Sequence, residues 1–302
     1  MKKGVLVAAV ALVAIASAAT VWWFMRDRGG TPQEDAAPAS ARRTGSALSP
    51  AQRGERAERV RAAVAHHRRL WRETTYVEIR DAAMGGDVVA QRRLSEIYED
   101  CLAYAGQMNV ALRMLGTLTK ADPAAQPTVK GIYTDYKHFC VQADADLRKN
   151  PDAGRYWLHK SAKAGDLASE MRYFGRTVPT LNSGQLKYFV DRLRASGDPD
   201  AIFEMALLLA KANESWPDPA MASAFRGESA QSAWMLAACR AGFDCARGSR
   251  ALNMVCITMF TCSHPDYERY LWFNNDTPAQ RTELTRLVTL IERDILQMQP
   301  TQ

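Results

Sequence analysis

The chain has 302 residues, of which 47% are hydrophobic and 24% are charged, an ordinary balance for a globular protein with a buried core. Its formal net charge of +6 is concentrated at one end, because residues 1–72 contain 13 Lys or Arg against 5 Asp or Glu. The remaining residues are therefore close to neutral, at about −2, which argues against nucleic acid as a partner of the body.

Residues 1–28 have the pattern of a membrane segment. Residues 4–25 carry no charge, and as a helix they would extend about 33 Å, enough to cross a bilayer core of about 30 Å. Trp22 to Phe24 lie at the far end, where interfacial aromatic residues are common. We expect a transmembrane anchor or signal-anchor that crosses a bacterial inner membrane once; a secretory signal cleaved after Ala18 is the alternative.

Six cysteines follow this segment, an even number, and the last four are closely spaced. Disulfides persist in oxidising compartments such as the periplasm, so the cysteines favour a periplasmic body. The spacing suits a zinc site less well, because zinc ligands usually come in pairs two to four residues apart. Of the fifteen possible pairings we favour Cys101 with Cys140, Cys239 with Cys245, and Cys256 with Cys262.

Residues 29–49 are rich in Gly, Pro, Ala, Ser and Thr and predict a disordered linker. Ser49 then supplies an N-cap and Pro50 a first helical residue, which together open a helical repeat domain over residues 50–302. The first helix is expected to run to about Trp71, and it is dense in arginine. Two interpretations of it stay open: a solvated helix interrupted by glutamates, or a surface that contacts anionic lipid head groups.

A short joint recurs along this domain. It consists of an alanine-rich helix end, a glycine that can adopt the left-handed conformation, and an aspartate that can cap the next helix. Successive glycines are 79, 32 and 45 residues apart, and the first interval has room for two units. Such irregular but similar spacing is typical of a degenerate array of helix pairs. The joints lie at Gly86 and Asp87, Gly165 and Asp166, Gly197 and Asp198, and, in degenerate form, Gly242.

This pattern resembles the Sel-one-like repeat, a relative of the tetratricopeptide repeat, over residues 74–246. Asn150 to Ala153, before Tyr156 and Trp157, also resembles that family's approach to its Ala-x-x-Trp helix. The resemblance implies an α-solenoid that serves as a protein-interaction scaffold. We therefore expect an all-α fold: an α-solenoid of helix-pair repeats behind an N-terminal transmembrane helix and a flexible linker. A non-repetitive helical bundle with Gly-Asp turns is the alternative.

The C-terminal part, from about residue 229 to residue 302, is expected to close the array as a cap held by disulfides. A short aromatic helix is predicted around Tyr267. Thr277, followed by proline and, three residues on, glutamine, has the pattern of a capping box and opens the last helix. Leu284 begins the apolar face of that helix.

Catalytic motifs are absent from the sequence: it contains no serine-hydrolase, zinc-protease, P-loop or dinucleotide pattern. His66 and His67 are adjacent on a helix and so point in different directions, which does not suit a metal site. His138 lies near Cys140, which would be a nucleophile only as a free thiol. We therefore expect no catalytic residue, no metal and no cofactor.

The sequence thus predicts a membrane-tethered periplasmic scaffold that binds a protein or peptide partner in the cell envelope. A deep pocket with convergent titratable groups would instead indicate a cell-envelope enzyme with an unrecognised active site. A purely structural spacer would have no concave patch.

Overall fold

The computed structural model describes residues 49–212, 216, 218–275 and 277–297. The predicted anchor and nearly all of the predicted linker lie outside these residues. Within the described part every regular element is helical, and the one extended pairing is an isolated bridge between Leu181 and Ala212. The all-α class is therefore confirmed there. In the same part of the chain no helix is long and apolar enough to cross a membrane.

Local chemistry sets where the helices begin. α2 (Pro50–Arg72) starts after the Ser49 cap, and α14 (Pro278–Leu290) starts in the same way after Thr277. In both, the cap side chain and a glutamine three residues on bond reciprocally with the backbone, which completes a capping box. The other elements are α3 (Tyr76–Met84), α4 (Val88–Ala121), η1 (Pro123–Ala125), α5 (Gln126–Asp135), η2 (Tyr136–Cys140), α6 (Val141–Lys149), α7 (Ala153–Lys163), α8 (Leu167–Thr177), α9 (Ser183–Ser196), α10 (Pro199–Leu209), η3 (Ala222–Phe225), α11 (Glu228–Ala241), α12 (Arg250–Met259), α13 (Tyr267–Phe273) and η4 (Ile291–Ile295).

The glycines of the four predicted joints all have positive φ, where glycine is favoured over other residues. The φ angle is 98° at Gly86 and Gly165, 66° at Gly197 and 113° at Gly242. At all but Gly197, two backbone hydrogen bonds return to the end of the preceding helix and form a Schellman motif. The recurring sequence pattern therefore corresponds to a recurring backbone turn.

The aspartates that follow three of these glycines cap the next helix. Asp87, Asp166 and Asp198 accept backbone N–H bonds at the starts of α4, α8 and α10. This produces the helix pairs α3–α4, α7–α8 and α9–α10. After Gly242 the chain turns but the next helix, α12, begins only at Arg250.

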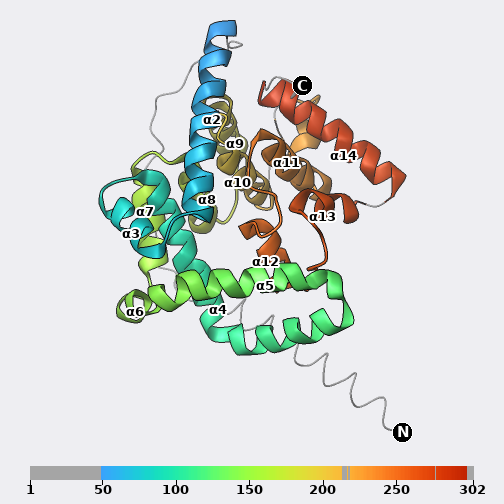
Figure 1. Cartoon of the computed structure of the whole chain (residues 1–302). Coiled ribbons are helices and arrows are strands. Elements are labelled where there is room, and N and C mark those ends of the chain that lie inside the picture. The colour runs from blue at the N-terminus through green and yellow to red at the C-terminus, as the bar shows by residue number, and fades with distance from the viewer. Residues whose placement is uncertain (1–48, 213–215, 217, 276, 298–302) are drawn as a thin grey trace. The chain divides into compact units, whose positions relative to one another are not determined.

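Packing links these pairs in succession. α4 lies against α3 and α7, α8 against α7 and α10, and α11 against α10 and α14 (Figure 1). One apolar core gathers around Ile79 and Leu94 of α3 and α4, and a larger one around Trp234 of α11. Each of these three side chains is fully buried.

Most of the 79-residue interval between the first two joints is taken up by α4 and by a helical segment that returns alongside it. This returning segment, residues 126–149, is called the excursion below. α4 runs for 34 residues, and α5, η2 and α6 then follow one another without a break. α5 also packs against α12 (Figure 1). Before α7 begins, the interval therefore contains one extended α4 and a returning helix, with no further joint.

Three cysteine pairs lie at bonding distance, and they are the pairs favoured from the sequence. Cys101 on α4 is bonded to Cys140 on η2, which ties the excursion to α4. Cys239 with Cys245 spans the Gly242 turn, and Cys256 with Cys262 spans the end of α12.

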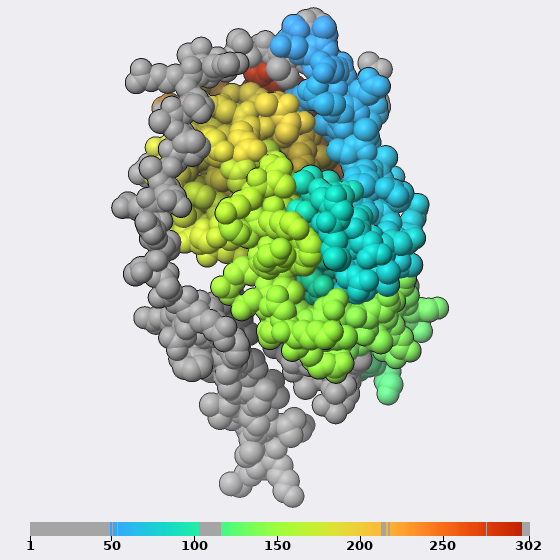
Figure 2. All heavy atoms as spheres, turned by 90° about the vertical axis from the view of Figure 1, so that its left-hand side faces the viewer, coloured from blue at the N-terminus to red at the C-terminus, as the bar shows by residue number. Residues whose placement is uncertain are grey.

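Helix α2 packs across the joints. The side chain of Val64 lies 3.0 Å from the point where a Cβ at Gly242 would stand, and Arg56 comes within 2.7 Å of the same point at Gly197. Arg72, at the end of α2, donates two hydrogen bonds of 2.9 Å to Asp244. Figure 2 shows α2 in blue along the upper right edge of the molecule. Its arginines thus divide between a buried side, with Arg56, and an exposed side, with Arg61, Arg68 and Arg69.

We expect Gly242→Ala to lower the free energy of unfolding by about 2–4 kcal/mol, because alanine would adopt an unfavourable φ and its methyl group would overlap Val64. Gly165→Ala is the matched control, since Gly165 also has positive φ but nothing lies within 4 Å of its added Cβ. Urea unfolding followed by circular dichroism measures both. Adding Val64→Ala should recover part of the Gly242→Ala loss. Equal losses at the two glycines would contradict close packing of α2.

The disulfides are expected to contribute unequally to stability. In the chain-entropy account, a bridge over the 39 residues from Cys101 to Cys140 is worth about 4 kcal/mol, and one over the 6 residues from Cys239 to Cys245 about 2 kcal/mol. Replacing each pair by alanines and comparing urea midpoints tests this ranking. A larger loss for the short bridge would contradict this ranking.

Candidate functional site

Buried charges surround Arg92 on α4. Its guanidinium lies 3.6 Å from Asp166, 3.9 Å from Asp198 and 3.3 Å from Asp200. The first two are joint aspartates that cap α8 and α10, so one arginine binds two predicted joints. Burial raises the pKa of Asp198 and Asp200 to about 7; the neighbouring carboxylates add to this rise, and Arg92 opposes it. His67 on α2 also contacts Asp200, at 3.1 Å, and burial lowers its pKa to about 3, so it binds as a neutral ring.

A second set of buried ion pairs continues from Arg92 along α4. Arg172 on α8 lies 2.9 Å from Glu96 on α4 and 2.9 Å from Glu204 on α10. Arg250 on α12 donates to Asp100 on α4 at 2.8 Å. Burial alone would raise the pKa of Glu96, but the surrounding arginines lower it to about 2. α4 is therefore joined to α8, α10 and α12 by charge.

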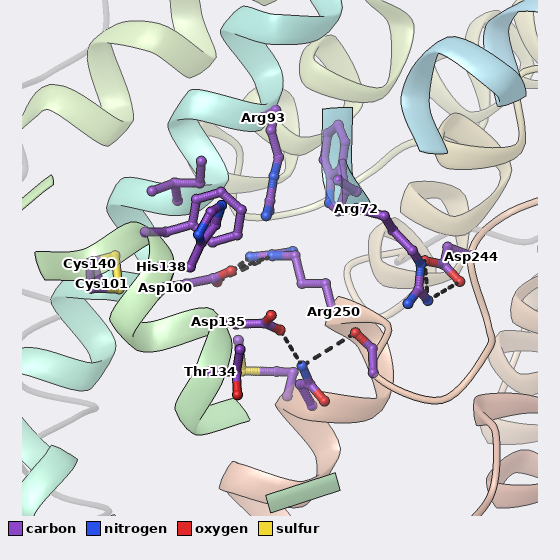
Figure 3. Close-up of a pocket in the computed structure, with 16 residues that line it drawn as sticks. Arg72, Arg93, Asp100, Cys101, Thr134, Asp135, His138, Cys140, Asp244 and Arg250 are labelled. Atoms are coloured by element: carbon purple, nitrogen blue, oxygen red, sulfur yellow. Dashed lines mark hydrogen bonds and ion pairs between the residues drawn. A yellow bond between two sulfur atoms is a disulfide. The ribbon is translucent and has the colours of Figure 1, made fainter. Parts of the chain in front are cut away.

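A cavity of about 320 Å³ opens beside this network, where α2, α4, the α5–η2 segment and α12 meet (Figure 3). This volume is at the small end of the range of about 300–1,000 Å³ found for ligand sites. Part of its wall is apolar, from Trp71, Ile97, Phe139 and Met254. The charged residues on the wall are Arg72, Arg93, Asp100, Asp135, Asp244 and Arg250.

Two ion pairs on this wall are satisfied. Arg72 holds Asp244 with two hydrogen bonds of 2.9 Å, and Arg250 holds Asp100 with bonds of 2.8 and 2.9 Å (Figure 3). Each is a two-point guanidinium–carboxylate contact, the strong geometry for such a pair. These four residues therefore have little capacity left for another ionic group.

Arg93 is the exception among the arginines of the wall. It is only 6% exposed, and its guanidinium lies 4.7 Å from the ring centres of both Trp71 and Phe139. No described residue accepts a hydrogen bond from it, and its Nε is a buried donor without a partner. Burial lowers the pKa of Arg93. The cavity thus contains a cation that is held by two aromatic faces and forms no ion pair with a described carboxylate, although Glu96, Asp100 and Asp135 attract it at longer range.

Asp135 is the unmatched acid of the same cavity. It forms no ion pair with a described residue, and it accepts a 3.1 Å hydrogen bond from Asn253 Nδ2. Burial raises the pKa of Asp135. Asn253 is itself only 5% exposed, and its Oδ1 is a buried acceptor without a described partner. Asp135 immediately precedes η2, a single turn of π-helix, and such turns are frequent at functional sites.

The structure brings only some of the predicted site residues to this cavity. Cys101 and Cys140 border it as a disulfide, so Cys140 is no thiol nucleophile for the neighbouring His138. Asp166 and Asp198 lie in the Arg92 cluster, and Asp87 contacts His66 at 2.9 Å. The joint glycines Gly86, Gly165, Gly197 and Gly242 and the cysteines Cys239, Cys245, Cys256 and Cys262 are not part of the cavity wall.

Arg93, Asp135 and Asn253 were not among the site residues predicted from the sequence. One signal was present for the arginine: Arg93 lies four residues before Ile97 and three after Ala90, on the apolar face of α4. A charge in that position is unusual unless it is paired or binds something. Asp135 and Asn253 offered no such signal, because they meet only through the packing of α5 on α12.

Within the described residues no cluster of three or more His, Cys, Asp or Glu side chains could hold a metal ion. The cavity has aromatic faces, one unpaired guanidinium and one unpaired carboxylate, which can hold a ligand by shape and charge. Comparison with protein-family models, curated proteins and solved structures finds no match to this chain.

The buried aspartates predict a pH dependence of stability. Because the pKa values of Asp198 and Asp200 are about 7 when folded and ordinary when unfolded, the folded chain keeps protons that the unfolded chain releases. Their contribution to stability therefore falls as the pH rises from about 4 to 7. In Asp200→Asn, the decline of the urea midpoint between pH 5 and pH 8 should be smaller than in the native protein. If the urea midpoint declined equally in both proteins, the charge of Arg92 would be holding the pKa of folded Asp200 near its ordinary value.

Proposed function

We propose that this protein is a membrane-tethered periplasmic scaffold of helix-pair repeats that binds a protein or peptide partner without converting it. The repeated Schellman turns and their capping aspartates support the relation to Sel-one-like repeats. The disulfides suit an oxidising compartment. The apolar segment at residues 4–25 supplies the proposed inner-membrane anchor.

The single observation that carries the binding role is the position of Arg93. A buried guanidinium without a carboxylate lowers the stability of a fold, because the charge has lost its water. Two aromatic rings offset only part of that cost. Stability alone therefore does not explain an arginine at this position. A carboxylate brought by a partner would give the Arg93 guanidinium the ionic hydrogen bonds that it lacks.

The proposed contact is thus between Arg93 and a carboxylate of the partner, either an acidic side chain or a free C-terminus. The guanidinium presents a planar face of donors, which matches the two oxygens of a carboxylate. Trp71 and Phe139 fix the plane of Arg93 before the partner arrives, so little side-chain freedom is lost on binding.

Affinity selection from a random hexapeptide pool with free C-termini, using the full-length protein in detergent, tests this role. Arg93→Met should reduce binding of the selected peptides by about 10- to 100-fold, the worth of one charge-assisted pair. Its urea midpoint should stay the same or rise, since an unpaired buried charge has been removed.

Arg61→Met is the matched control, because Arg61 lies on the exposed side of α2 and its loss removes one charge without touching the cavity. It should bind the selected peptides as the native protein does. Equal enrichment by the native protein and Arg93→Met would refute the proposed site. A large loss of stability in Arg93→Met would show that the arginine serves the fold.

A further inference from the structure

The unmatched charges of the cavity are of opposite sign. Once the pairs Arg72–Asp244 and Arg250–Asp100 are set aside, Arg93 and Asp135 remain on the wall. Figure 3 shows Arg93 entering the cavity from α4 and Asp135 from the α5 side. No ion pair joins these two described residues, but they attract each other at longer range: Asp135 opposes the fall in the pKa of Arg93, and Arg93 opposes the rise in the pKa of Asp135. A ligand with a single negative charge would complete one of them and leave the other unpaired.

The Asp135 side of the cavity offers acceptors. The amide nitrogen of Asn253 is already used, since it donates to Asp135 and, at 3.5 Å, to the carbonyl of Gly248. The Asn253 Oδ1 is fully buried, so the acceptor that the cavity offers is the Asp135 carboxylate. A carboxylate can accept hydrogen bonds from an ammonium, which has three N–H donors.

The size and the apolar wall limit the rest of the ligand. A cavity of about 320 Å³ accommodates a small molecule or the last residue of a peptide. Ile97 and Met254 provide apolar contact for a short hydrocarbon chain between the two charged groups.

We propose that the cavity binds a zwitterion, with a carboxylate on Arg93 and an ammonium on Asp135. The inference rests on the proposed function, because it uses the same Arg93 contact, and it adds the second charge and hence the ligand class. Two sources have this chemistry: a free amino acid, and a C-terminal residue with a basic side chain on a partner peptide.

The test uses the full-length protein in detergent and isothermal titration calorimetry. The probes are the ω-amino acids from glycine to 6-aminohexanoate, each compared with the monocarboxylate of equal chain length. The best ω-amino acid should bind at least 10-fold more tightly than its monocarboxylate, and the chain length of that best member reports the spacing of the two charged groups.

Variants assign the two ends of the ligand. Asp135→Asn should remove the advantage of the ω-amino acid while leaving the monocarboxylate unaffected, and Arg93→Met should weaken both by 10-fold or more. Asp144→Asn, which alters an exposed acid on α6, should change neither. Comparing L-lysine with the peptide Gly-Gly-Lys then separates the sources: tight binding of the peptide favours a partner's C-terminus, and exclusion of the peptide favours a free amino acid.

The outcomes separate this inference from the proposed function. If monocarboxylates and ω-amino acids bind equally and both depend on Arg93, or if only the selected hexapeptides bind, the zwitterion is wrong and the binding scaffold stands. If none of the probes and none of the hexapeptides bind through Arg93, both are wrong.

Discussion

The described fold depends on one constraint: Arg92 and Glu96 of α4 are buried charges, so each must be met by a charge on another helix. Arg92 and Glu96 lie on a helix whose buried apolar side chains belong to the first core. Their partners lie on or beside α8 and α10, whose apolar side chains belong to the second. Removing one member of such a cluster leaves an uncompensated buried charge, which is costly. Buried ion pairs are weak contributors to net stability but strict about position. They therefore fix how the two cores lie against each other.

The cavity is a result of the same helix. α4 continues past the first core, and the returning helix packs on α12 while the Cys101–Cys140 disulfide holds it to α4. This leaves a space between the excursion and the end of α2, which the aromatic rings of Trp71 and Phe139 close only in part. Arg93 faces that space because it is one residue beyond Arg92, about 100° further around the helix. Neighbouring arginines thus have different roles: one holds the cores together and the other remains available.

Much of the local structure could be predicted from the sequence, because its causes are local. The caps at Ser49 and Thr277 and the glycine turns depend on a few consecutive residues, and all are present. The cysteine pairing followed from short spacing for two bridges. The excursion and the packing of α2 could not be predicted, because they depend on contacts between residues far apart in the chain. Arginine density in α2 suggested a solvated or lipid-facing helix, whereas Arg56 and His67 pack inward. The candidate site could not be predicted for the same reason, because Asp135 and Asn253, which meet in it, are 118 positions apart in the chain.

The packing of α2 across the joints also orders the events of folding. Arg56 donates to the carbonyl of Leu296, 240 positions later, and Arg72 binds Asp244, 172 positions later. α2 is synthesised before every other described helix, yet the surface it covers is complete only after the last helix has been made. Contacts that close such long loops form late, since the chain entropy they cost is regained only when the rest is in place. Among the described helices, the first to leave the ribosome is therefore expected to dock last, and until then the wall of the cavity that carries Trp71 and Arg72 is missing.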